Sequence, residues 1–295
     1  MSVVLKGLKI YSDNLSAIVS VGDDGGSSGI LREQLGLIPP GDFRNCLVAL
    51  AEDESLVGKL FQYRFSQGEG LQGHSFGNLF IAAMANITGG FDQALIESSK
   101  VLSVNGSILP ATLSPIELIA DLGNGSTLRG ESKIGGTGDS INRLSIDPAE
   151  VKAYPKSIDA IYNAELIVLG PGSLYTSVLP SLLVSEIKEA VAKSNAYKIY
   201  VCNVATQPGE TSNYGIDEHV SALVDHTMED FVDCVIANNL VGIEAESIIS
   251  NIPPGPSRVN GINVVYGDII DVENKYRHDP NSLADLIIKV YHNSR

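Results

Sequence analysis

The stretch Gly22–Asn45 reads G-D-D-G-G-S-S-G-I-L-R-E-Q-L-G-L-I-P-P-G-D-F-R-N and combines two adjacent carboxylates, a glycine-serine turn and two arginines. An apolar run at 17–21 precedes it and predicts a buried strand, and Ile30, Leu31 and Leu35 follow at helical spacing. The acidic loop therefore lies at the carboxyl end of a strand. Open α/β sheets bind ligands there, because helix amino-termini and loop amides converge at that edge. An anionic ligand fits this position.

The same loop could simply turn the chain and cap the next helix, as Asp, Ser and Gly commonly do. Two adjacent acids followed by two glycines and two serines exceed what a cap requires. Arg32 and Arg44 add cationic groups that suit phosphate recognition. We therefore interpret the loop as part of a ligand site.

The composition limits the class of protein. The 295 residues are 44% hydrophobic, enough for a substantial core, and 35 acidic against 20 basic residues give a net charge of -15. This charge opposes binding to nucleic acid through a broad surface. The three cysteines are widely spaced, so neither a disulfide framework nor a zinc site is indicated, and a cytoplasmic location is expected. No signal peptide or membrane span is predicted, since no apolar window approaches about 20 residues.

The order of patterns predicts an α/β fold. Amphipathic helices are expected at 54–66, 76–86 and 91–102, and an Asn-Gly turn at 123–125 predicts a hairpin between 116–122 and 127–134. From residue 158 onward, apolar strands at 165–169, 199–203, 232–237 and 262–266 alternate with helices, which is typical of a parallel sheet. Asp279 and Pro280 predict the start of a closing helix. We expect one domain over 1–295, with a hairpin and helical insertion at about 54–145.

A glycine-rich loop, G-P-G-S-L-Y-T-S at 170–177, follows the strand at 165–169. Its amides could bind a phosphate, and Ser173 could touch the ligand or only cap the helix. The loop matches neither the Walker pattern nor G-x-G-x-x-G. The loop after the next strand, 203–211, offers Asn203, Thr206 and Gln207 to a base or sugar at the same sheet edge.

The remaining polar candidates are weaker. His74 and Asn78 lie one helical turn apart and face the same side, and Arg277 could reach a phosphate. His219, His226 and His292 are predicted at the surface. The sequence has no His and Cys ligand cluster, so a bound cation is expected to be Mg²⁺ at Asp23 and Asp24, held together with substrate phosphates. No G-x-S-x-G elbow indicates a serine hydrolase.

Several of these motifs together resemble the YvcK-type gluconeogenesis factor family, which is related to the CofD phospholactate transferases. They are D-D-G-G-S-S-G-x-L-R, P-P-G-D-x-R-N-C, H-S-x-G-N, L-G-P-G-S-L-Y-T-S, N-x-x-T-Q-P-G-E-T and R-H-D. The resemblance as a whole covers the chain from about Ser2 to the carboxyl end. The family pattern begins with a strand and a G-G-G-T-G loop, whereas this chain opens at Met1–Leu8, which we expect to be the helix after that loop.

The resemblance implies a three-layer CofD-like α/β fold with a mostly parallel, Rossmann-like sheet flanked by helices. It implies a cytoplasmic regulatory protein that binds UDP-sugars, notably UDP-N-acetylglucosamine, and links carbon metabolism to cell-wall synthesis and cell shape. A homodimer and a protein partner in cell-wall synthesis are open expectations. The alternative is a Mg²⁺-dependent transferase that moves a phospho-group from a nucleotide-activated donor.

No catalytic residue is assigned. The ligand-binding candidates are Asp23, Asp24, Gly25, Ser27, Arg32, Arg44, Asn45, His74, Asn78, Gly170, Gly172, Ser173, Tyr175, Asn203, Thr206, Gln207 and Arg277.

Overall fold

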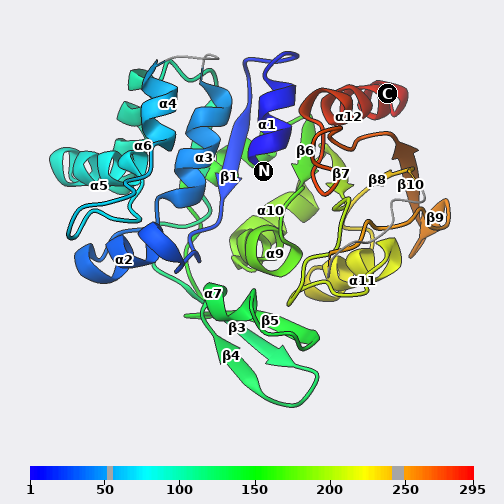
Figure 1. Ribbon diagram of the computed structural model, residues 1–295. Helices are drawn as coiled ribbons and strands as arrows, with labels where there is room; N and C mark the ends of the chain where they lie inside the picture. The colour runs from blue at the N-terminus through cyan, green and yellow to red at the C-terminus, as the bar shows by residue number, and fades with distance from the viewer. Residues whose placement is uncertain (52–55, 241–248) are drawn as a thin grey trace.

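The larger sheet of the computed structural model, which describes residues 1–51, 56–240 and 249–295, has five strands in the order β6-β7-β8-β10-β9 (Figure 1). The strands are β6 (Leu166–Leu169), β7 (Tyr197–Val201), β8 (Cys234–Asn238), β9 (Arg258–Val259) and β10 (Ile262–Gly267). All neighbours pair in parallel except β9, which is antiparallel to β10. The predicted parallel sheet is confirmed, and its strands lie close to the predicted ranges.

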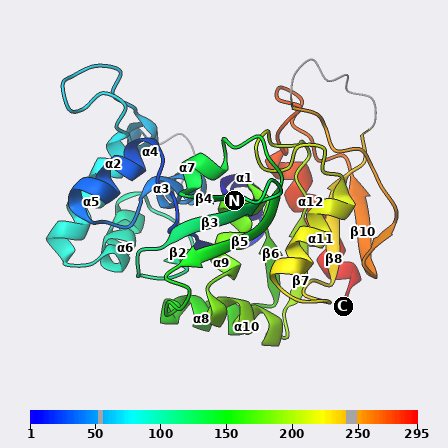
Figure 2. The ribbon, with the colours of Figure 1, turned by 90° about the horizontal axis from the view of Figure 1, so that it is seen from below.

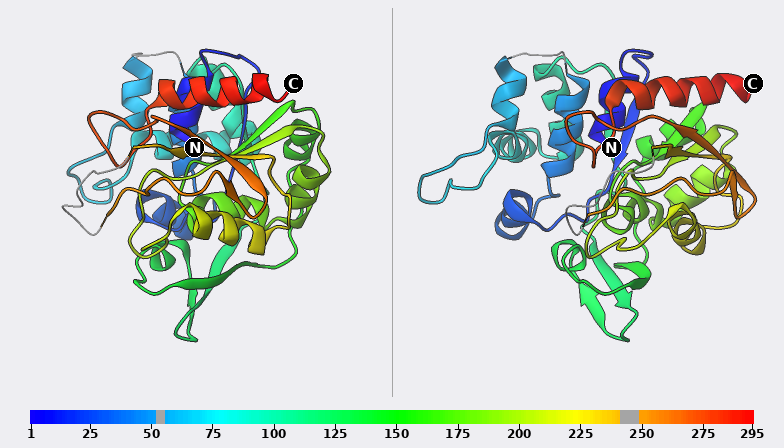
Figure 3. Two further views of the ribbon diagram at one scale, coloured as in Figure 1. Left: turned by 90° about the vertical axis from the view of Figure 1, so that its right-hand side faces the viewer. Right: turned by 45° about the vertical axis from the view of Figure 1, so that its right-hand side comes forward.

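Helices cover both faces of this sheet, which makes three layers (Figure 3). One face packs against α1 (Ser2–Leu8) and α12 (Pro280–Asn293), and the other against α9 (Leu179–Leu182), α10 (Ser185–Lys193) and α11 (Ile216–His226). Ile199 faces the first helix layer and Tyr200 the second, so β7 is buried on both sides. This explains why the central strands read as continuous apolar runs.

The amino-terminal half forms a second parallel pair, β1 (Ser16–Val19) with β2 (Ser107–Pro110). Between these strands run α2 (Gly26–Leu35), α3 (Gly41–Leu50), α4 (Leu56–Gln62), α5 (Phe76–Thr88) and α6 (Phe91–Val101). Within the described ranges, β1 and β2 have no hydrogen-bonded neighbour in the larger sheet. The predictions for β1, α5 and α6 are confirmed, whereas β2 and α3 had no clear pattern in the sequence.

A three-stranded antiparallel sheet, β4 (Thr127–Arg129), β3 (Glu117–Leu122) and β5 (Ile141–Asp147), lies below the helical half and the larger sheet in Figure 1 and in front of them in Figure 2. It confirms the hairpin, but residues 131–134 form a helical turn, α7 (Glu131–Ile134), instead of extending the strand. Pairing ends at Arg129, and Gly130 at φ 99° changes the chain direction. The chain continues through α8 (Pro155–Tyr162) into β6.

The sequence predictions about burial are wrong at two helices. In the amphipathic helix expected at 54–66, the apolar Leu56 and Leu60 of α4 are 81% and 43% exposed, and Phe61 carries the buried contact of this short helix. Residues 54–55 of the predicted helix lie outside the described residues. His219, predicted at the surface, is fully buried, because it lies on the inner face of α11 against Tyr214. His226 is also half-buried. In the part of the chain that the structure describes, no helix is both long and apolar enough to cross a membrane.

Candidate functional site

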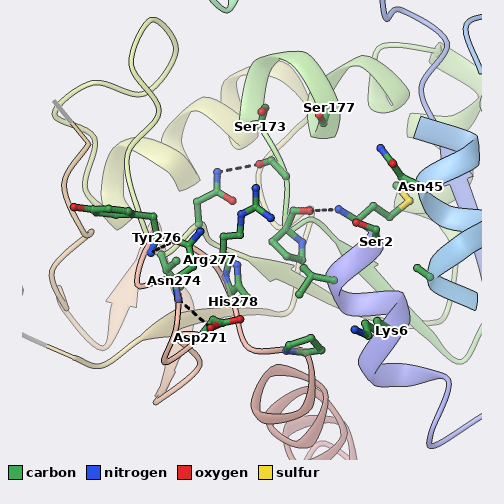
Figure 4. A pocket seen from close by; sticks show the side chains of 18 of the residues that line it. Ser2, Lys6, Asn45, Ser173, Ser177, Asp271, Asn274, Tyr276, Arg277 and His278 are labelled. Atoms are coloured by element: carbon green, nitrogen blue, oxygen red, sulfur yellow. Dashed lines mark hydrogen bonds between the residues drawn. The ribbon is translucent and has the colours of Figure 1, made fainter. Parts of the chain in front are cut away.

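A cavity of about 1380 Å³ opens where β6 and β7 end, between α1 and the turn that leads into α12 (Figure 4). Its walls come from segments far apart in the chain, as expected for the carboxyl edge of an α/β sheet. Seven of the predicted residues line it: Asn45, Gly172, Ser173, Asn203, Thr206, Gln207 and Arg277. The two βα loops therefore share one cavity, and Arg277 enters it from a third segment.

The two loops are fastened to each other by side chains that the sequence suggested for the ligand. Asn203 Nδ2 donates to the Gly172 carbonyl at 3.0 Å, and Gln207 Nε2 donates to Ser173 Oγ at 2.7 Å. Thr206 bonds to Ser250 instead of facing the cavity freely. Because Ser173 Oγ accepts the Gln207 bond, the proton of its hydroxyl remains available as a donor.

A tight turn holds Arg277 toward the cavity (Figure 4). The Asp271 carboxylate accepts the N–H groups of Glu273 and Asn274, and the backbone of Arg277 bonds to Asn274 and Asp271. The Arg277 guanidinium itself has no hydrogen bond or ion pair within the described ranges. It is therefore a preorganised donor that a ligand can engage.

Two lysines of the cavity wall, Lys6 in α1 and Lys59 in α4, carried no motif and were not predicted. Neither forms an ion pair with any residue that the structure describes. His278 also lines the cavity, where Nε2 bonds to the Cys202 carbonyl at 3.1 Å. Burial lowers the pKa of His278 to about 4, so this ring is neutral at physiological pH.

The motifs around Ser27 and His74 meet in a second polar cluster. Ser27 Oγ accepts from Asn78 Nδ2 at 3.2 Å and from the Ser75 N–H at 3.4 Å, and it lies 3.0 Å from His74 Nδ1. Because both of these N–H groups donate to Ser27 Oγ, its hydroxyl proton is available to His74 Nδ1. Asn78 is only 2% exposed, and its Oδ1 has no hydrogen-bond partner among the residues that the structure describes. Such an orphaned acceptor is expected where a ligand or water completes a network.

The two predicted arginines of the opening motif differ. Arg32 donates to the Ile116 carbonyl at 2.6 Å and also reaches the Asp23 carbonyl, so it holds α2 and its loop against the segment before β3. Arg44 donates to Asn45 Oδ1 at 2.8 Å, and its Nε is buried and has no hydrogen-bond partner in the described part of the chain. Burial, and then the nearby charge of Arg64, lower the pKa of Arg44. Arg44 therefore retains free donor capacity, whereas Arg32 is occupied by the backbone.

The acidic pair mainly organises the protein's own backbone. Asp23 Oδ1 accepts the Gly25 N–H at 2.9 Å, and Asp24 Oδ1 accepts the Ser132 N–H at 2.8 Å. The second bond begins α7 and explains why the predicted strand turns into a helix there. Within the described ranges, no group of three or more His, Cys, Asp or Glu residues is arranged to hold a metal ion. A Mg²⁺ ion held by Asp23 and Asp24 together with substrate phosphates therefore stays a prediction.

The turn α7 connects the acidic loop to the cavity. Its first residue, Glu131, lies among Asp23, Asp24 and Glu210, and Glu210 lines the cavity. Burial, and then repulsion from these carboxylates, raise the pKa of Glu131 to about 7. The charges of this acidic cluster therefore act next to the cavity, although of these four residues Glu210 alone lines it.

Replacing Glu131 with Gln is expected to stabilise the protein at pH 8 and to have little electrostatic effect at pH 4. The folded state holds the Glu131 proton more tightly than the unfolded state, whose pKa is near 4.5, so stability falls as the pH rises from 4.5 through about 7. Since the side chain is partly exposed, we expect about 1 kcal/mol. Chemical denaturation of both proteins across this range measures the difference, and equal pH profiles would contradict it.

Two predicted residues lie beneath the cavity. Gly170 adopts φ 83°, and a Cβ there would lie 2.9 Å from the Val201 carbonyl, so glycine allows the loop to leave β6 close to β7. Tyr175 is buried, and its hydroxyl bonds to Tyr214 and the Ile141 carbonyl. Tyr175 thus anchors the loop in the core. Gly25 serves as the residue before α2.

Comparison with known proteins assigns this chain to a family. Residues 1–253 match the family described as 2-phospho-L-lactate transferase CofD. The chain belongs to the CofD family. This assignment confirms the fold class that the resemblance implied, and the resemblance to gluconeogenesis factors is confirmed by the relatives below.

Among relatives of this CofD-family chain, the gluconeogenesis factor of Bacillus subtilis is 44% identical over 98% of the chain and 94% of the relative. A relative from Nostoc sp. is 46% identical over 99% of the chain, which spans 66% of that relative's length. A crystal structure of a UPF0052 family member from Bacillus halodurans superposes with a TM-score of 0.92, at 41% identity over 97% of this chain and 95% of that one.

Proposed function

We propose that this protein binds a nucleotide-sugar of the UDP-N-acetylglucosamine type in the central cavity. We further propose that it acts in the cytoplasm as a regulator that links carbon metabolism to cell-wall synthesis and cell shape. The observation that carries the ligand class is the Arg277 guanidinium at the cavity, which pairs with no side chain in residues 1–51, 56–240 and 249–295, with Lys6 and Lys59 on the other walls. The similarity to the gluconeogenesis factor of Bacillus subtilis supports the regulatory role.

The distribution of charge suggests how such a ligand would lie. Arginine bonds phosphate oxygens in pairs, and lysine adds a point charge, so we assign the diphosphate to Arg277 and expect Lys6 on the cavity wall to add to the attraction. Glu210 and Asp271 also line the cavity and would repel phosphate, but Asp271 can accept bonds from sugar hydroxyls or a base N–H. The cavity volume of about 1380 Å³ exceeds that of most small-molecule sites and suits a sugar nucleotide.

Titration with UDP-N-acetylglucosamine is expected to stabilise the purified protein and to release or absorb heat in calorimetry. At a ligand concentration 100 times Kd, the free energy of unfolding should rise by about 2.7 kcal/mol. Uridine, which lacks the diphosphate, serves as the control and should have at most a weak effect. An unchanged melting curve with UDP-N-acetylglucosamine and other UDP-sugars would refute the proposal.

The second candidate is a phospho-group transferase, which the family description of the matched residues 1–253 favours. Asp23 and Asp24 are the residues we propose to assist a Mg²⁺ ion brought by a nucleotide, and Glu131 interacts electrostatically both with them and with Glu210 of the cavity wall. Incubation with Mg²⁺ and labelled nucleotide-activated donors tests it. Formation of product would make transfer the function, whereas binding without turnover supports the regulator.

A further inference from the structure

We propose that Glu210 is a positioning residue of this site, which holds the loop after β6 so that the Ser173 and Ser177 hydroxyls face the ligand. The inference rests on the proposed function and adds to it a residue that affects ligand binding by ordering the loop after β6. Glu210 belongs to the loop after β7, so its contacts cross from one βα loop to the other.

The contacts of Glu210 form a clamp. One carboxylate oxygen accepts the Tyr175 N–H at 3.2 Å, and the other accepts the Thr176 hydroxyl at 2.8 Å. Together with the bonds from Asn203 to Gly172 and from Gln207 to Ser173, they fasten one loop along the length of the other. The clamp lies at the start of η1 (Leu174–Val178), the helical turn that carries Ser177.

Burying a carboxylate at position 210 costs free energy of desolvation. Glu210 is only 7% exposed and forms no ion pair with any residue that the structure describes. Burial raises its pKa, and the bonds from Thr176 and Tyr175 oppose that rise. Burying an unpaired charge is costly unless hydrogen bonds compensate. We therefore attribute the Glu210 carboxylate to its role in holding the loop after β6.

The clamp determines what the loop presents to the cavity. Ser173 accepts a bond from Gln207, so its hydroxyl proton remains available, and Ser177 follows one turn later, where its N–H bonds to the Ser173 carbonyl. Both serines line the cavity (Figure 4). Because Glu210 fixes Tyr175 and Thr176 between them, both hydroxyls are preorganised as donors for an anion.

A pure charge effect and a positioning role of Glu210 predict opposite changes in ligand affinity when Glu210 is replaced, so the experiment can distinguish them. Removing a negative charge from the wall of an anion site should by itself strengthen binding. Removing the clamp should weaken it. Glu210→Gln loses the charge, but its amide oxygen can still accept the Tyr175 N–H and its amide N–H can donate to the Thr176 hydroxyl oxygen. Glu210→Ala loses both the charge and the clamp.

We expect UDP-N-acetylglucosamine to bind Glu210→Ala at least tenfold more weakly than wild type, and Glu210→Gln as tightly or more tightly. Hydrogen exchange of the free proteins should be faster at residues 175–177 in Glu210→Ala and unchanged in Glu210→Gln. The matched control is Glu218→Ala, which removes a carboxylate that also accepts a backbone N–H, that of Gly215 at 2.7 Å, but lies outside the cavity lining. Its affinity should equal that of wild type.

Tighter binding by both Glu210 variants would overturn the proposal in favour of a pure charge effect, and so would unchanged exchange in Glu210→Ala. If Glu210→Ala does not fold, Thr176→Val removes one clamp bond at nearly constant volume, and an unchanged affinity would refute the proposal. If wild type binds no UDP-sugar, the proposed function fails, whereas the exchange comparison still decides whether Glu210 holds the loop.

Discussion

Replacing Arg277 with Ala is expected to weaken UDP-N-acetylglucosamine binding by about ten- to a hundredfold, the largest effect of any single side chain in the cavity. A hydrogen bond between charged groups contributes about 1.5–3 kcal/mol, and each 1.4 kcal/mol is a factor of ten in Kd. Arg277 has its full donor set available, and its turn is already ordered by Asp271 and Asn274. Isothermal titration calorimetry of both proteins measures the loss.

Two further variants distinguish the contribution of the Arg277 guanidinium geometry to ligand affinity from that of positive charge alone. Arg277→Lys keeps the charge but loses the planar pair of donors, so its affinity should fall between those of wild type and Arg277→Ala. Arg258→Ala removes a guanidinium of β9 whose Nε bonds to Asn263 and which does not line the cavity. That control should bind as wild type does. Equal Kd values for Arg277→Ala and wild type would show that the diphosphate is not bound here.

Replacing Gly7 with Ala is expected to destabilise the protein by about 3 kcal/mol or more, which corresponds to a fall in Tm of about 6–12 °C. A Cβ at Gly7 would lie 2.0 Å from the Pro280 carbonyl oxygen and 2.8 Å from the Ala284 Cβ, so α1 and α12 could not keep their present separation. Moving the helices apart would loosen the buried contacts of Val4 and Leu283 on the larger sheet.

The matched control for Gly7→Ala is Gly136→Ala. The nearest atoms to a Cβ at Gly136 are 3.7 Å and 3.8 Å away, which is ordinary van der Waals contact. We expect this control to retain the stability of wild type in thermal and chemical denaturation. A Gly7→Ala protein as stable as the control would mean that the close approach of α1 to α12 does not limit the packing.

Local sequence patterns determined the regular elements of this protein. The strands at β6, β7, β8 and β10 are short apolar runs between turn signals, and α12 begins where Asp279 accepts the Ser282 N–H at 2.8 Å before its first turn. These features depend on residues a few positions apart, so spacing alone predicts them. The same argument placed the two βα loops at one sheet edge.

Only the tertiary structure decided how the polar groups are used. Asp24 and Arg32 carry the charges that suggested a ligand, yet Asp24 bonds to the backbone of α7 and Arg32 to a carbonyl before β3. Lys6 and Lys59 lie on helices without any motif, and the packing of α1 and α4 brings them to the cavity. The physical reason is that a side chain donates to whichever acceptor the fold brings near it, and that partner can be about a hundred residues away in the chain, as between Asp24 and Ser132. Sequence spacing thus determined that the loops after β6 and β7 reach one sheet edge, and long-range packing decided which other groups join them there and which remain free for a ligand.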